Sequence, residues 1–241
     1  MKPVRLGINI DHIATLREAR HSQNPDTVEA ARIILASGAD TIIMHYRADK
    51  KHIQFSDLER VRREVPGQLH LEIAPIPEME NAVLSIMPDS VCFVPEKKEE
   101  RSACGGLLLC KNNMAQTEKM IKMFSEAGIE TGIYCDPVPQ ALRDAHNLGA
   151  DTVNLSAVNY SLSRGKKNQA AELEKIQLAS YLVKELKMNI EAGGGLSYYN
   201  IEPIAAIPDM ACVNAGFSVI SRAIFSGLKE AVSELKAIIE A

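Results

Sequence analysis

Side chains that could bind a ligand or transfer protons follow an apolar segment near the N-terminus. Asn9 and Asp11 share one face if this segment is a strand, because side chains alternate along a strand with a period of two. An amide and a carboxylate are costly in an apolar interior unless they have polar partners. An Asx turn that ends the strand would explain either residue alone. Together with His12 and Arg20, the pair favours a binding or catalytic site.

Two further apolar segments carry polar side chains with the same alternation. His45 and Arg47 share one face, and this pair suits a phosphorylated substrate, because the guanidinium can bind the phosphate while the imidazole exchanges a proton. His70 and Glu72 share a face of the next segment, where packing in the core is the simpler explanation of His70. A buried carboxylate is costly unless it is paired, so Glu72 is either half of an ion pair or a base with a raised pKa. We favour the base.

Two glycine-containing segments near the C-terminus favour phosphate binding. Gly193 to Gly195 follow one apolar segment, and Gly216 follows another. Glycines allow backbone N–H groups to approach an anion, and a helix that begins near Ser218 would direct its positive end to the same place. Turn formation would explain either segment alone, but the two together indicate a phosphate site.

The elements that must position these residues alternate short strands with longer helices. Eight apolar segments, each followed by a segment with helical periodicity, predict a single closed (β/α)8 TIM barrel of the α/β class. Three of the predicted helices end at a glycine just before the next strand. An open, doubly wound sheet is the alternative, but no GxGxxG motif follows the first strand. The predicted strands are 4–10, 40–45, 69–74, 90–94, 131–135, 152–156, 189–192 and 211–215, and the predicted helices are 26–37, 56–65, 78–87, 115–127, 138–148, 168–187, 200–206 and 218–239.

Length and composition fit this fold and exclude several classes of function. The 241 residues are close to the ~250 of one such barrel, so we expect a single domain over 1–241. A net charge of -4 with both signs interspersed gives no basis for nucleic-acid binding. The five cysteines lack CxxC spacing, no apolar segment approaches the ~20 residues of a membrane span, and no signal peptide is visible. We therefore expect a cytoplasmic protein without a membrane segment.

Several segments together resemble the pyridoxine 5'-phosphate synthase family. The most specific is GINIDHIATLREAR at 7–20, and the others are MHYR at 44–47 with a following His-Ile pair, Leu-Glu at 71–72, VPEK at 94–97 and IAAIP at 204–208. The resemblance implies a (β/α)8 barrel that condenses 1-deoxy-D-xylulose 5-phosphate with 3-amino-2-oxopropyl phosphate. The products are pyridoxine 5'-phosphate, inorganic phosphate and water. It also implies a homo-oligomer, an octamer, that needs no metal and no organic cofactor.

The resemblance also implies roles for individual residues. His45 and Glu72 correspond to bases, and Asn9 and Arg20 correspond to contacts of the aminoketone phosphate, with Arg20 reaching a neighbouring subunit. The residues that correspond to contacts of the deoxyxylulose phosphate or of the phosphate loops are Asp11, His12, Arg47, His52, Ser102, Gly195, Gly216 and Phe217.

The second half of the chain departs from the family pattern at ionisable positions. Gly194 stands where the family has a proton-donating His, Phe217 where it has a second His, and Asn154 where it has a Glu on the sixth strand. Glu191 replaces a family Asn on the seventh strand, and we hypothesise that its carboxylate restores the charge and serves in catalysis. Three functions are consistent with this pattern: a synthase with a rearranged proton relay, a paralogue that acts on another phosphorylated ketose or aminoketone, or a non-catalytic protein that binds a phosphorylated ligand. Retention of His45 and Glu72 argues against the last.

Overall fold

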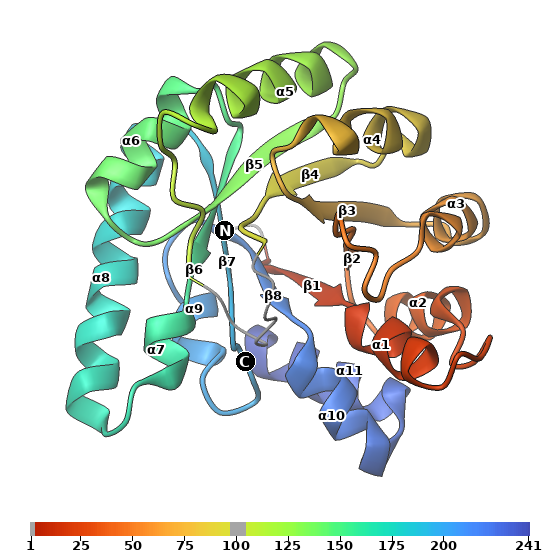
Figure 1. Ribbon diagram of the computed structural model, residues 1–241. Coiled ribbons are helices and arrows are strands. Elements are labelled where there is room, and N and C mark those ends of the chain that lie inside the picture. Colours follow the sequence, from red (N-terminus) through yellow and green to blue (C-terminus); the bar gives the residue numbers. More distant parts are fainter. Residues whose placement is uncertain (1–2, 97–104) are drawn as a thin grey trace.

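The structure is a computed structural model that describes residues 3–96 and 105–241. Eight parallel strands pair in sequence order, and the last pairs with the first, so the sheet closes into a barrel. Helices surround this sheet on the outside (Figure 1). The (β/α)8 barrel predicted from the alternation of strands and helices is therefore confirmed.

The strands and helices keep the predicted order, with some additional helices. The strands are β1 (Arg5–Asn9), β2 (Thr41–His45), β3 (Gln68–Ile73), β4 (Ser90–Phe93), β5 (Glu130–Cys135), β6 (Thr152–Ser156), β7 (Asn189–Gly193) and β8 (Met210–Ala215). The helices are α1 (Asp11–Ala19), α2 (Thr27–Ala36), α3 (Phe55–Glu64), the 3-10 turn η1 (Pro77–Met79), α4 (Glu80–Ile86), α5 (Met114–Glu126), α6 (Pro139–Asn147), α7 (Val158–Leu162), α8 (Lys166–Glu185), α9 (Glu202–Ala205), α10 (Phe217–Ser226) and α11 (Leu228–Glu240).

Side chains along each strand point alternately toward the surrounding helices and toward the barrel interior. In β1, Leu6 and Ile8 are fully buried in the large hydrophobic cluster between the sheet and the helices. Leu69 and Leu71 of β3 belong to the same cluster. Glu72, of opposite parity, therefore faces the interior of the barrel, as predicted. The apolar core thus lies outside the sheet, and the interior is free to carry polar groups.

Helices α1, α7 and the α10–α11 pair differ from the prediction. Helix α1 begins at Asp11, directly after β1, and its buried residues Ile13, Ala14 and Arg17 have the spacing of one helical face. Helix α7 is a short addition after β6. The helix predicted over 218–239 is two helices, because Gly227 takes a φ of +82° between them.

The predicted helix ends at glycine are confirmed. Gly38, Gly128 and Gly149 follow α2, α5 and α6 with φ values of +105°, +81° and +85°. A residue with a side chain is strained in this left-handed region, so glycine ends each helix before the next strand. A glycine recurs at this position because each βα unit must turn the chain back so that the next strand starts at the same end of the barrel.

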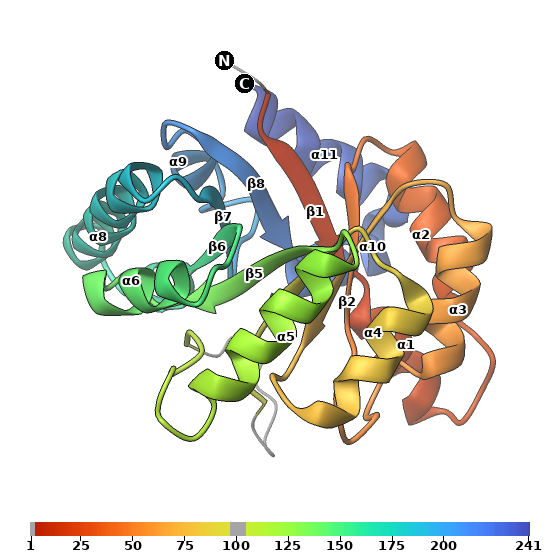
Figure 2. The ribbon, with the colours of Figure 1, turned by 90° about the horizontal axis from the view of Figure 1, so that it is seen from above.

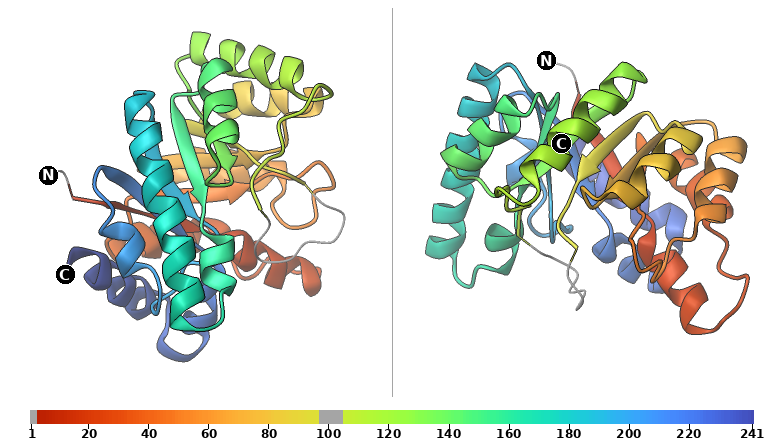
Figure 3. Two further views of the ribbon diagram at one scale, coloured as in Figure 1. Left: turned by 90° about the vertical axis from the view of Figure 1, so that its left-hand side faces the viewer. Right: turned by 45° about the horizontal axis from the view of Figure 1, so that its top comes forward.

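All strands end at the face of the barrel that lies opposite the chain ends. In Figure 2 the start of β1 and the end of α11 lie at one end, and the arrowheads of β1 and β8 point away from it. Helices α6 and α8 pack side by side over the strands around β5 and β7 (Figure 3). Within the described residues, no helix combines the length and the apolar composition that crossing a membrane requires.

Candidate active site

The carboxyl ends of the strands enclose a cavity of about 1260 Å³. This is more than the 300–1,000 Å³ of a usual small-molecule site, so there is room for two small ligands. The wall includes residues from most of the strands and from the first turn of α10. The predicted site residues on this wall are Asn9, Asp11, His12, His45, Arg47, His52, Glu72, Gly195, Gly216 and Phe217.

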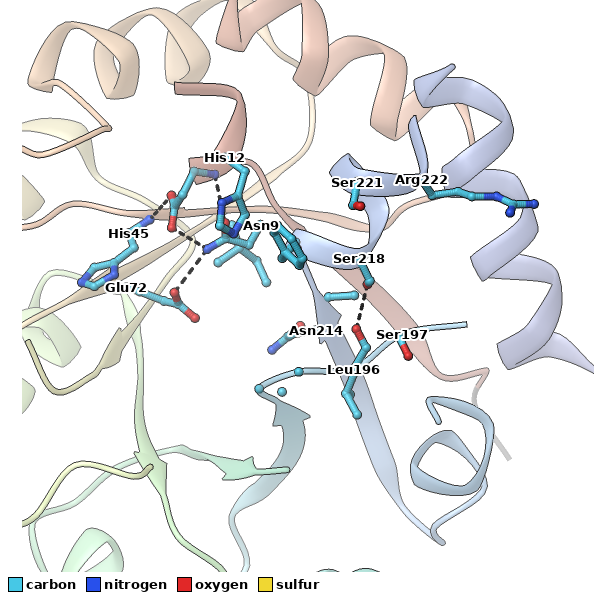
Figure 4. Close-up of a pocket in the computed structure, with 18 of the residues that line it drawn as sticks. Asn9, His12, His45, Glu72, Leu196, Ser197, Asn214, Ser218, Ser221 and Arg222 are labelled. Atoms are coloured by element: carbon cyan, nitrogen blue, oxygen red, sulfur yellow. Dashed lines mark hydrogen bonds between the residues drawn. The ribbon is translucent and has the colours of Figure 1, made fainter. Parts of the chain in front are cut away.

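A hydrogen-bonded cluster joins the ends of β1, β2 and β3 (Figure 4). Asn9 Nδ2 donates to Asp11 Oδ2 over 2.8 Å and lies 3.4 Å from Glu72 Oε2. The backbone N–H of His45 donates to Asp11 Oδ1 over 2.8 Å, and that of Asp11 donates to Asn9 Oδ1 over 2.9 Å. The second of these bonds forms an Asx turn, the alternative explanation that the sequence left open. Asn9 and Asp11 therefore shape the backbone and also face the cavity.

His45 and Glu72 are register partners on adjacent strands, and each alters the charge state of the other. Burial raises the pKa of Glu72, and the negative charge of Asp11 adds to this, although a positive His45 opposes it. Burial lowers the pKa of His45, but the nearby carboxylates of Glu96, Asp11 and Glu72 outweigh it, so the net shift is upward. His45 Nε2 lies 3.7 Å from Glu96 Oε1. Both groups thus bind a proton more readily than their exposed counterparts, which makes them candidates for proton transfer.

The loop after β2 places Arg47 and His52 against the cavity. The buried Arg47 guanidinium pairs with Asp49, with nitrogen–oxygen distances of 2.8 and 2.6 Å, and hydrogen bonding to it lowers the pKa of Asp49 to about 2. His52 is buried, accepts a hydrogen bond at Nδ1 from the backbone N–H of Ile53, and stands edge-on to His45 at 5.9 Å. The end of β2 and this loop therefore bring one cation and two imidazoles together.

A buried ion pair that the sequence did not reveal supports this loop. Arg17 of α1 donates to both carboxylate oxygens of Asp57 and, over 3.3 Å, to the carbonyl of His52. Asp57 also accepts from Thr27 Oγ1 and from the backbone N–H of Gln54 at the start of α3. The only sequence signal was a charged residue on the apolar face of a helix, which must find a partner when buried.

Glycines at the ends of β7 and β8 allow close packing on the other side of the cavity. Gly194 and Gly195 have φ values of +98° and +76°. Gly216 approaches Asn9 so closely that a β-carbon at 216 would lie 3.0 Å from that of Asn9. Ser218 Oγ of α10 donates over 2.8 Å to the carbonyl of Leu196, which ties the two segments together (Figure 4).

The first turn of α10 therefore opens on the cavity with its N–H groups and positive dipole end. Phe217 begins this helix, lines the cavity and contacts the ring of His12 edge-on at 5.2 Å. Where the family has an imidazole, this chain thus has an apolar ring that packs against the imidazole of His12.

Two predicted residues lie away from the cavity wall. Arg20 is exposed at the C-terminal end of α1. Glu191 lines a second cavity of about 60 Å³, where it lies 3.5 Å from Arg5 Nη2 and accepts a hydrogen bond of 3.2 Å from Asn214 Nδ2. Its register partner Asn154 reaches the large cavity. The carboxylate of Glu191 thus turns toward the amino ends of the strands, below the level we expected.

His70 also lines the small cavity, and Ser102 lies outside the described residues. His70 is buried and its Nδ1 lies 2.7 Å from Ser90 Oγ. This placement agrees with packing in the barrel interior.

Asp11, His45 and His52 place one potential metal ligand each within 4.8 Å of one another. Both oxygens of Asp11 already accept hydrogen bonds, from Asn9 Nδ2 and from the backbone of His45. Hydrogen bonding therefore accounts for this carboxylate without a metal ion.

Comparisons with known proteins identify the family of this chain. Residues 6–241 match the family described as pyridoxal phosphate biosynthesis protein PdxJ. A pyridoxine 5'-phosphate synthase of Elusimicrobium minutum (strain Pei191) is 40% identical over 233 residues, which cover 97% of this chain and 96% of that protein. One of Thermodesulfovibrio yellowstonii (strain ATCC 51303 / DSM 11347 / YP87) is 41% identical over 239 residues, covering 98% and 97%.

A solved structure supports the fold alone. Phosphoribosyl anthranilate isomerase from Thermotoga maritima superposes with a TM-score of 0.64 at 14% identity, and 98% of each chain is covered. The identity is too low to transfer an activity, but the barrel is shared over its whole length. The match over residues 6–241 and the full-length relatives at about 40% identity show that this chain belongs to the PdxJ family of pyridoxal phosphate biosynthesis proteins.

Proposed function

We propose that this chain is a pyridoxine 5'-phosphate synthase of vitamin B6 biosynthesis. It condenses 1-deoxy-D-xylulose 5-phosphate with 3-amino-2-oxopropyl phosphate and releases inorganic phosphate and water. The observation that carries the proposal is the position of His45 and Glu72, side by side at the carboxyl end of the barrel and linked through Asn9 and Asp11. Two bases on adjacent strands are what this reaction requires.

The reaction needs protons to be removed at several stages. An amine and a ketone join to give an imine, and the later eliminations and ring closure each remove a proton from carbon or oxygen. Glu72 and His45 take these protons, because both side chains line the cavity and burial raises the pKa of Glu72, so that its carboxylate binds a proton more readily than an exposed one. Asn9 holds the Glu72 carboxylate in place from the side of β1.

Two phosphate groups give the enzyme two handles for positioning the reacting carbons. We assign one phosphate to the first turn of α10 and the glycine segments, with Gly195, Gly216 and the backbone of Phe217 as its donors. The other lies near Arg47, His12 and His52, and Ser102 joins them by the family resemblance. The cavity of about 1260 Å³ supports the simultaneous presence of both substrates.

Arg20 has a place in this scheme only if the protein is a homo-oligomer. It is exposed at the end of α1, away from the cavity of its own chain. We propose a cytoplasmic homo-octamer in which Arg20 contacts the aminoketone phosphate bound by a neighbouring subunit. Neither a metal nor an organic cofactor enters the proposed reaction.

A second candidate is a paralogous reaction on another phosphorylated ketose or aminoketone. It is favoured by the loss of ionisable groups at Gly194, Asn154 and Phe217, all of which line the cavity. Glu191 does not compensate for them by direct contact with the large cavity, because it lines the smaller one.

One assay separates the two candidates. Purified protein is incubated with both phosphates, and pyridoxine 5'-phosphate and free phosphate are measured together, with Glu72→Gln as the inactive control. Formation of both products supports the synthase. Tight binding of one substrate without product from the pair would contradict it and favour the paralogue.

A further inference from the structure

Gly194 leaves a space that the side chain of Tyr134, on β5, fills. A β-carbon at position 194 would lie only 2.3 Å from Tyr134 Oη and 2.8 Å from Val158 Cγ2. The backbone there has a φ of +98°, which also favours glycine. A side chain at 194, such as the imidazole that the family pattern has, could therefore not coexist with the tyrosine hydroxyl in this arrangement. Tyr134 occupies the place where that side chain would begin.

The Tyr134 side chain joins an apolar cluster of the barrel interior to a group of polar atoms. Its ring packs with Cys92 and Val94 in a small cluster inside the barrel. Its hydroxyl donates toward Ser156 Oγ over 3.1 Å and lies 3.4 Å from the carbonyl oxygen of Gly193. The residue also lines the large cavity. The hydroxyl is thus held at a fixed point beside the space that a substrate would occupy.

The position of Tyr134 relative to the bases is suited to acid–base chemistry. In the order of the closed barrel, β6 and β7 lie across from β2 and β3, and β5 lies next to β6. A substrate between these sides would meet His45 and Glu72 on one face and the Tyr134 hydroxyl toward the other. An elimination is served by a base at one bond and a proton donor at the other.

We infer that the Tyr134 hydroxyl, supported by Ser156, is the catalytic proton donor on the β5–β7 side of the cavity, in place of the side chain missing at 194. This inference rests on the proposed synthase function. In a dehydration step, a base on β2 or β3 removes a proton from a substrate carbon, and the new carbon–carbon double bond displaces the carbon–oxygen electron pair. The Tyr134 proton passes to that oxygen, which leaves as water. The phenolate then regains a proton from solvent through the Ser156 hydroxyl, and the base releases its proton to solvent.

The protonation state of Tyr134 agrees with a donor. Burial raises the pKa of this phenol well above its usual value, and the nearby charge of Glu72 adds to the shift. The hydroxyl therefore keeps its proton across the neutral range, when Glu72 is needed as a base. If the Tyr134 hydroxyl served only to hold Ser156 by a hydrogen bond, its removal would leave kcat nearly unchanged. If it is the proton donor, its removal lowers kcat.

Tyr134→Phe removes the hydroxyl and leaves the ring that packs with Cys92. We expect kcat to fall by about 10²–10⁴-fold, the usual contribution of a general acid, while KM for both phosphates changes little. Tyr160→Phe is the matched control, because it removes another buried tyrosine hydroxyl, bonded to the carbonyl of Asn200, from a residue that does not line the large cavity. It should retain the wild-type kcat. Thermal melting of both variants checks that they fold.

The outcomes separate the inference from the proposed function. A folded Tyr134→Phe with wild-type kcat, or with only KM raised, would overturn the role of Tyr134 and leave the synthase function standing. Absence of pyridoxine 5'-phosphate with the wild-type protein would overturn both. A selective loss of kcat in Tyr134→Phe, with Tyr160→Phe unaffected, supports the inference.

Discussion

Replacing Arg17 by Met tests how the loop that carries His52 is held. The Arg17 side chain is 9% exposed and that of Asp57 only 3%. Arg17 Nη2 donates to Asp57 Oδ2 over 2.8 Å, and a second guanidinium nitrogen donates to Oδ1. Hydrogen bonding to Asp57 raises the pKa of Arg17, so the guanidinium stays charged at any pH at which the protein folds. The variant thus deletes a permanent charge from the interior.

The magnitude follows from what remains around Asp57. Without the guanidinium, its carboxylate keeps two donors, Thr27 Oγ1 at 3.1 Å and the backbone N–H of Gln54 at 2.8 Å, but makes no other ion pair within the described residues. Breaking a buried pair by removing one partner costs about 3–5 kcal/mol, because the other charge stays buried and unpaired. Typical domains have unfolding free energies of about 5–15 kcal/mol, so the loss would be severe. The double variant Arg17→Met/Asp57→Asn should recover part of it, since no unpaired charge remains.

Urea denaturation at one fixed protein concentration measures these differences, and a fixed concentration matters because subunit association also contributes to stability. Arg63→Met is the matched control: this side chain is 67% exposed and pairs with Glu64 at the surface, so its loss should change stability little. An Arg17→Met protein within about 1 kcal/mol of wild type would refute the reasoning, because an unpaired Asp57 would then cost no more than a surface charge.

Three further variants or treatments test the base side of the cavity. Glu72→Gln should lower kcat by about 10²–10⁴-fold. The same variant should also make stability less dependent on pH. The folded-state pKa of Glu72 lies above the ordinary 4.5, so the wild type loses stability as the pH rises from 4.5 through the raised pKa, and Gln cannot ionise. Denaturation at pH 4 and at pH 8 measures the difference for both proteins. Glu96→Gln should lower the pKa of His45, followed by NMR titration, and an unchanged pKa would contradict the contact. Treatment with EDTA should leave activity unchanged, whereas loss restored by a divalent cation would indicate a metal at Asp11, His45 and His52.

The interior faces of the strands could be predicted from the sequence because the pleat fixes their period. Once Leu69 and Leu71 are assigned to the helix-facing core, Glu72 must face the interior. Parallel strands in a barrel also end at one face, so polar residues at their carboxyl ends must meet. Asn9 and Glu72 are brought within 3.4 Å by these two rules, although 63 residues separate them in the chain.

Other features of the site depend on tertiary distances that the periodicity of strands and helices does not give. Asp11 begins a helix directly after β1, and no helical segment was predicted there. The partner of Arg17 is Asp57, 40 residues away, and several acidic residues would have satisfied the same pattern. Glu191 has the predicted inward parity, but parity does not give depth, and this carboxylate reaches Arg5 instead of the large cavity.

Tyr134 was missed for a different reason, and that reason bears on how the site works. A tyrosine on an apolar strand is predicted to be a core residue. Only the distance of 2.3 Å between its Oη and a β-carbon placed on Gly194 connects it with the missing imidazole. Ionisable groups brought close together inside a barrel shift one another's pKa, as Asp11 and Glu72 already do to His45. A phenol on the far side gains nothing in charge near neutral pH, so it adds a proton donor without disturbing the bases. The side of the cavity formed by β5 to β7 is thus neutral, with Tyr134, Asn154 and Gly194 on its wall, while Glu72 lies on β3 and Arg222 and Glu234 lie on α10 and α11.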